Sequence, residues 1–249
     1  MQICLMTKMI RINANIGDIT IVNGKIVKKG EADKTYTFDE RKIEEARNID
    51  KIVIDTPFAN VNILPCDFSK VEAHLYGNVS SDGNFEFDVH IERDELRINL
   101  KSIGSYVIGN LNLDLAIPYK TFRLINVITS SGNVIIKKGV LAQKLKVKTM
   151  SGNLNAVIRS GAILANTMSG NVELYVNALE DVDISVSTMS GEVLTQLNNI
   201  GQLNCSTSSM SGRVQKMHKG KDGYTADVDI STMSGNVTIE DYRKKKRFI

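Results

Sequence analysis

The sequence predicts an all-β protein in which repeated strand pairs stack into a β-solenoid, or β-helix-like, body behind an irregular N-terminal β cap. A motif of the form Thr/Ser-x-Ser-Gly-x-Val/Leu recurs six times in the second half of the chain, with glycines 18 to 23 residues apart. Such a period indicates stacked repeats, because one short unit cannot bury its own apolar face. Apolar residues alternate with polar ones around each copy, as in half-buried strands. The copies are Thr129–Val134, Thr149–Leu154, Thr167–Val172, Thr188–Val193, Ser209–Val214 and Thr232–Val237.

Each repeat is predicted to be a strand, a Ser-Gly corner, a second strand and a looser return. Before the corner at Gly191 the apolar residues are Val182, Ile184 and Val186, and after it the alternation resumes with the other parity at Val193. A glycine with φ > 0 would turn the chain in this way at little cost. About 20 residues at roughly 3.3 Å each make one coil. We assign a structural role to the corner residues Ser131, Gly132, Ser151, Gly152, Ser169, Gly170, Ser190, Gly191, Ser211, Gly212, Ser234 and Gly235.

The chain divides into four predicted segments. Residues 1–50 are expected to hold a β-hairpin, because Asn23-Gly24 separates two short apolar runs, followed by a charged, solvated connector with a short helix as one option. Residues 51–122 have strands of less regular spacing. We expect them to cap the solenoid, since an open end exposes unpaired strand edges. Residues 123–240 are the solenoid repeats, and residues 241–249 form a basic tail.

Charge and hydropathy limit the partners and the location. The formal net charge of +3 depends on the tail residues Arg243, Lys244, Lys245, Lys246 and Arg247, so the body is near neutral and no nucleic-acid partner is expected. We interpret the tail as a solvated terminus, with peripheral contact with an anionic membrane, at about 1 kcal/mol per basic residue, or contact with another macromolecule as the alternatives. Neither a signal peptide nor a membrane span is visible. These features predict a cytoplasmic protein, or one peripheral at the inner face of the membrane, with the cell surface as the alternative.

No set of reactive side chains predicts a catalytic or cofactor site. Cys4, Cys66 and Cys205 are too sparse for a zinc site or a disulfide framework, and we expect free thiols, with Cys205 at a core-facing position. The three histidines lie in separate segments. Polysaccharide-cleaving β-helix enzymes need paired carboxylates, whereas the repeats carry Thr, Ser, Asn and Met at equivalent positions. We therefore expect no catalytic residue, no cofactor and no metal.

Two columns of side chains leave alternatives open. Four aspartates alternate outward in two repeats, and we interpret them as solvated, with a weak Ca²⁺ site as the alternative. They are Asp181, Asp183, Asp227 and Asp229. A methionine precedes Ser-Gly in five copies, and its thioether suits Cu(I). Because methionine also fills corners, we interpret this column as packing. It consists of Met150, Met168, Met189, Met210 and Met233.

One stretch of the chain resembles a known family. Leu111–Pro118 alternates and ends at a proline, Leu124–Ile128 follows, and Thr129–Ile136 continues through Ser-Gly-Asn-Val. With the further Ser-Gly repeats, this succession resembles the "putative adhesin" family of bacterial β-strand repeat proteins, also called toastrack domains. The resemblance covers roughly residues 50–240. It implies a β-solenoid-like domain with an envelope-stress role in many members, and it implies no activity.

These observations predict a non-enzymatic scaffold or interaction protein of the "putative adhesin" type, related to envelope stress. Its expected partner is another protein or a second copy of itself. The prediction depends on six similar corners without a unique reactive group. An exported, surface adhesin-like protein is one alternative and requires an export route. A carbohydrate-active β-helix enzyme is the other and requires a carboxylate pair.

Overall fold

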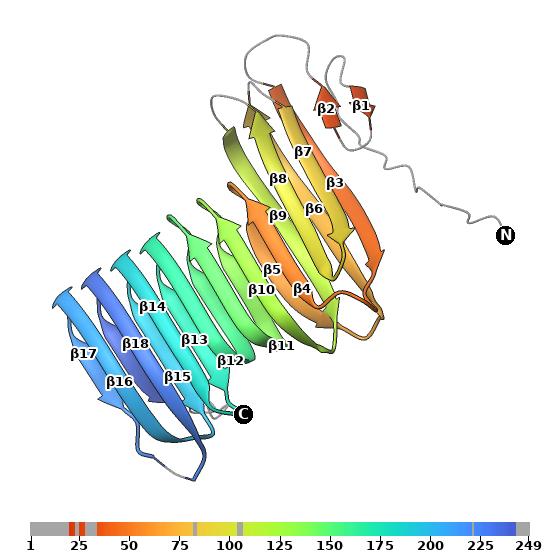
Figure 1. Ribbon diagram of the computed structural model, residues 1–249. Coiled ribbons are helices and arrows are strands. Elements are labelled where there is room, and N and C mark those ends of the chain that lie inside the picture. The colour runs from red at the N-terminus through yellow and green to blue at the C-terminus, as the bar shows by residue number, and fades with distance from the viewer. Residues whose placement is uncertain are drawn as a thin grey trace, which may run out of the picture.

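The computed structural model describes residues 20–22, 25–27, 34–81, 84–103, 107–220 and 222–242, and every regular element in these ranges is a β-strand (Figure 1). The predicted all-β class is therefore confirmed. The repeats contain β10 (Thr121–Thr129), β11 (Val134–Thr149), β12 (Leu154–Ser169), β13 (Val172–Asn177), β14 (Val182–Ser190), β15 (Val193–Asn198), β16 (Ile200–Ser211), β17 (Val214–Met217), β18 (Tyr224–Ser234) and β19 (Val237–Asp241).

The repeat strands stack in parallel into two sheets, joined by the Ser-Gly corners. We call them the pre-corner sheet, with β10, β14, β16 and β18, and the post-corner sheet, with β13, β15, β17 and β19. β11 and β12 bend through both. In β14 the even-numbered residues from Val182 to Thr188 are buried, and in β15 the odd-numbered ones. The predicted change of parity at Gly191 is thus confirmed, and it directs the apolar side chains of both strands into one core.

The last coil of the chain does not lie at the end of the stack. β18 pairs with β14 on one side and with β16 on the other, and β19 likewise separates β15 from β17. In Figure 1 the dark blue strands of this coil lie inside the lighter blue coil of β16 and β17. After β15 the chain therefore leaves one position in the stack open and forms the β16–β17 coil beyond it. It then returns to fill the open position with β18 and β19.

Inward side chains explain which coil is terminal. Ile230 and Ile239 of the interior coil are fully buried. Their neighbours in the terminal coil are Thr207 and Lys216, and Lys216 Nζ donates a hydrogen bond to the Cys205 carbonyl across the open end, at 3.3 Å. Polar inward residues cost less at a solvated end than in the core, so this coil acts as the cap that a repeat stack needs.

The other end of the stack is interleaved in the same way. β4 (Lys51–Thr56) and β5 (Asn60–Cys66) form a coil between the β10–β11 coil and the strands β8 (Glu95–Ile103) and β9 (Val107–Pro118). All of these contacts are parallel. Parallel stacking therefore begins at residue 51, ahead of the range 123–240 that the motif marks.

Antiparallel strands complete the N-terminal cap. β6 (Lys70–Ser81) pairs with β9, β7 (Asn84–Glu92) pairs with β8, and β3 (Lys34–Glu45) pairs along its length with β6. The charged connector, or short helix, that was expected to follow the hairpin within residues 1–50 is wrong for residues 34–45, which form β3. Tyr36 and Phe38 alternate inward and pack edge-on against Phe85, so aromatic burial fixes a strand despite the surrounding charge. β1 (Thr20–Val22) and β2 (Lys25–Val27) pair antiparallel, as the predicted hairpin requires.

Candidate functional site

The Ser-Gly corners form a column along one edge of the stack. Gly132 N–H donates to Thr129 Oγ1 at 3.0 Å, and Gly152 N–H donates to Thr149 Oγ1 at 2.9 Å, so a buried threonine closes each of these two turns. The corner serines are exposed in all six copies. The corners turn the backbone from one strand to the next. Their serine hydroxyls occur in six equivalent copies, so none of them stands out as a reactive group.

Close stacking, and not backbone conformation, explains the corner glycines. A Cβ on Gly170 would lie 2.1 Å from the carbonyl oxygen of Gly152, and one on Gly191 would lie 2.1 Å from that of Gly170. The expected φ > 0 is wrong, because no corner glycine has a positive φ. In the repeats, positive φ falls instead at Asn199, at Gly220 and at Gly139, where the register of β11 shifts and the strand bends between the two sheets.

An asparagine ladder beside the glycines was missed by the sequence reasoning. Asn153 N–H donates to Asn133 Oδ1 at 2.9 Å, and Asn171 N–H donates to Asn153 Oδ1 at 2.8 Å. Each side chain thus satisfies a backbone donor of the next coil. The signal was present, since asparagine follows the glycine in four of the six copies, but its partner becomes visible only when the coils are stacked.

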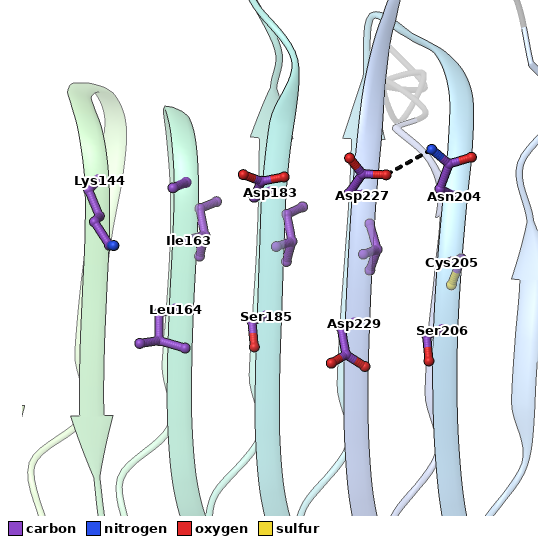
Figure 2. Close-up of a pocket in the computed structure, with 13 residues that line it drawn as sticks. Lys144, Ile163, Leu164, Asp183, Ser185, Asn204, Cys205, Ser206, Asp227 and Asp229 are labelled. Carbon is purple, nitrogen blue, oxygen red and sulfur yellow. Dashed lines mark hydrogen bonds between the residues drawn. The ribbon is translucent and has the colours of Figure 1, made fainter.

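The candidate site is a shallow groove of about 680 Å³ on the outward side of the pre-corner sheet (Figure 2). It crosses β11, β12, β14, β18 and β16. Ala162 and Ser185 have short side chains, whereas the neighbouring Lys144 and Leu164 have longer ones. The hollow therefore follows from side-chain size on a flat array of parallel strands.

The groove has an acidic side and a basic side. Asp183 and Asp227 lie opposite each other in the register of β14 and β18, with Asp229 two residues further along. Asp227 Oδ1 accepts a hydrogen bond from Asn204 Nδ2 at 2.8 Å. Lys144 lies on β11 at the other side of Ala162. Like charges placed directly opposite across strands are unfavourable, so a cationic group bound here would relieve their repulsion.

The remaining titratable candidates do not gather into one site. Each histidine contacts a carboxylate in its own surroundings: His74 with Asp39, His90 with Asp88, and His218 with Asp241. Within the described ranges, no group of three or more His, Cys, Asp and Glu side chains could hold a metal ion. The Ca²⁺ alternative thus has no donor set there.

Two of the three cysteines lie in the described part of the chain, and Cys4 lies outside it. Cys66 and Cys205 are free and partly exposed. Cys205 faces inward as expected, but it is not fully buried, because β16 is the terminal strand. The proposed contact residues Arg243, Lys244, Lys245, Lys246 and Arg247 lie outside the described residues. No helix in the described part of the chain is long and apolar enough to cross a membrane.

The fold defines a β-solenoid repeat protein with interleaved ends. Residues 113–240, just over half of the chain, match the family model Toastrack DUF4097, and the chain belongs to this family. The expected resemblance is therefore confirmed. No match was found among curated proteins.

Solved structures with partial similarity come from Clostridium, Bacteroides and Parabacteroides species. A "putative cell adhesion protein" from Clostridium sporogenes is 12% identical, with 83% of this chain and 100% of that chain covered at a TM-score of 0.49. A "putative adhesin" from Bacteroides fragilis is 14% identical, with 82% and 97% covered at 0.45. A "putative lipid binding protein" from Parabacteroides distasonis is 16% identical, with 82% and 97% covered at 0.37.

Proposed function

We propose that this protein is a non-enzymatic scaffold whose outer groove binds a partner protein through a segment that carries lysine or arginine beside an apolar side chain. The observation that carries the proposal is the groove itself. Asp183, Asp227 and Asp229 line one part of it, and Leu164 supplies an apolar wall next to them. A cation paired with the aspartates would offset their repulsion, while an apolar neighbour would cover Leu164.

The architecture suits a binding platform. The groove spans five parallel strands, each hydrogen-bonded to its neighbours, so its residues are held at fixed relative positions before a partner arrives. Preorganisation lowers the entropic cost of association. Since the contact residues repeat with the strand spacing, we expect each of them to contribute modestly and none to act alone.

Site-specific photocrosslinking in cells tests the groove. A benzoylphenylalanine at Ser185 is expected to give a discrete adduct with one protein, because Ser185 lies in the groove. The same residue at Leu194 is the control, since it lies on β15 of the post-corner sheet. Asp227→Lys and Asp229→Lys are each expected to weaken the Ser185 adduct severalfold by removing the attraction for a cation.

Charge reversal elsewhere on the same sheet separates a specific contact from a general charge effect. Asp55 is exposed on β4, outside the groove, and Asp55→Lys should leave the adduct unchanged. An adduct that is insensitive to both groove substitutions, or that is equally strong from Leu194, would rule out the groove as the binding surface. If the protein had a measurable catalytic turnover and a single groove substitution abolished it, the protein would instead be an enzyme.

We also propose that the basic tail attaches the scaffold peripherally to an anionic membrane. Five basic residues at positions 243–247, at about 1 kcal/mol each near such a surface, give marginal attachment that salt should reverse. Fractionation of native cells should place the full chain with the membrane, and high salt or deletion of residues 243–249 should release it. Equal recovery of both forms away from the membrane would refute the attachment, and recovery outside the cell would favour the exported alternative.

A further inference from the structure

A row of exposed methionines runs along the corner edge of the stack and is not used by the proposed scaffold function. One methionine lies directly before the Ser-Gly corner in five repeats. These residues are 47–82% exposed, which is unusual for a large apolar residue. In the order in which the coils stack, the row is Met150, Met168, Met189, Met233 and Met210.

Strand register places neighbouring methionines side by side. The residues that flank Met168 pair with those that flank Met189, and the residues that flank Met189 pair with those that flank Met233. Parallel strands lie about 4.8 Å apart. A methionine side chain has three rotatable bonds and a polarizable sulfur. Two or three sulfurs can therefore converge on one ion without movement of the backbone.

The surroundings of the central three methionines favour a soft cation. Each is followed by an exposed serine, and the residues two positions earlier are Asn166, Ser187 and Ser231. Hydroxyl and amide oxygens are poor ligands for a soft metal, whereas thioethers select Cu(I). None of these flanking residues is a carboxylate, the ligand that Ca²⁺ and Mg²⁺ sites usually include, so the thioethers are the donors that distinguish this row.

We propose that Met168, Met189 and Met233 bind Cu(I) through their thioether sulfurs. The sequence alone favoured packing for this column, and the exposed fractions of the side chains reverse that preference. A thioether carries no titratable proton. Its affinity for the metal therefore stays constant as the pH falls, in contrast to thiolate and imidazole sites, which lose metal to proton competition.

The test uses Ag(I), an air-stable probe of the same chemistry, and the full chain with Cys4, Cys66 and Cys205 replaced by serine so that no thiol competes. Methionine labelled with ¹³C at its methyl group is followed by NMR during titration at pH 5 and pH 7. The signals of Met168, Met189 and Met233 should shift together, with the same affinity at both values of pH. Met217, which is 43% exposed on β17 outside the row, should not respond.

The matched variant carries Met168→Leu, Met189→Leu and Met233→Leu, which keep apolar volume but remove the sulfurs. It should melt like the cysteine-free parent and lose Ag(I) affinity by about tenfold or more. Anaerobic competition for Cu(I) with a chromophoric chelator should likewise show a lower affinity for the leucine variant than for the cysteine-free parent. Unmoved signals, undiminished binding by the leucine variant, or an equal response of Met217 would each overturn the proposal.

Discussion

Gly170→Ala is expected to lower the free energy of unfolding by about 3 kcal/mol, and the melting temperature by roughly 6–12 °C for a chain of this size. The added Cβ would lie 2.1 Å from the carbonyl oxygen of Gly152. That oxygen belongs to the backbone of the adjacent coil, so the clash cannot be relieved by rotating a side chain. The two coils must move apart, and the parallel ladder on both sides of the corner is strained. Thermal and urea unfolding followed by circular dichroism measure the loss.

Gly161→Ala is the matched control, because it adds the same methyl group within β12, the strand that leads into the Gly170 corner. Its Cβ would approach Glu180 Oε1, the end of an exposed and flexible side chain, at 2.6 Å. The side chain can turn away, and alanine restricts the unfolded chain more than glycine. This variant should therefore be as stable as the parent or slightly more stable. If both variants melt alike, close stacking of the corners is not what requires glycine.

Local patterns in the sequence predicted the repeating unit well. The alternation around each Ser-Gly corner, and its change of parity, gave the two sheets and the inward residues because a strand has a side-chain period of two. The physical cause assigned to glycine was wrong, since it was argued from the freedom of one residue. The observed cause is the carbonyl oxygen of another coil, which no single repeat contains.

The order of the coils could not be predicted from the repeats. Each corner motif stacks equally well on any other, so the motif does not say that β18 lies between β14 and β16. A weaker signal lay in the inward positions, where Thr207 and Lys216 replace the isoleucines of the last coil. Interpreting these two residues as the polar lining of a terminal coil would have placed the β16–β17 coil correctly at the end of the stack.

The candidate groove depended on that order. Asp183 and Asp227 are 44 residues apart in the sequence and become neighbours only because β18 inserts beside β14. Sequential stacking would have placed Asn204 beside Asp183 and moved Asp227 one coil away. The outward alternation of the aspartates was visible in the sequence, but the charge density that makes the groove a candidate site was a consequence of topology.

Glu40→Met is expected to stabilise the protein by about 1–3 kcal/mol at pH 7. Glu40 lies on β3, is 1% exposed, and neither of its carboxylate oxygens has a hydrogen-bond partner. Burial raises the pKa of this carboxyl above its ordinary value of 4.5, and Lys42 opposes the shift only in part. Methionine fills a similar volume without the buried polar group.

The effect of Glu40→Met should grow with pH. A carboxyl whose pKa is raised in the folded state favours folding fully below its ordinary pKa, and this contribution is lost as the pH rises through the folded value. The variant lacks this loss, so its advantage over the parent should be small at pH 4 and largest at neutral pH. Glu44→Met, on the same strand at a less buried position, is the control for removing an acid. An advantage that is independent of pH, or equal in both variants, would show that burial does not raise the pKa of Glu40.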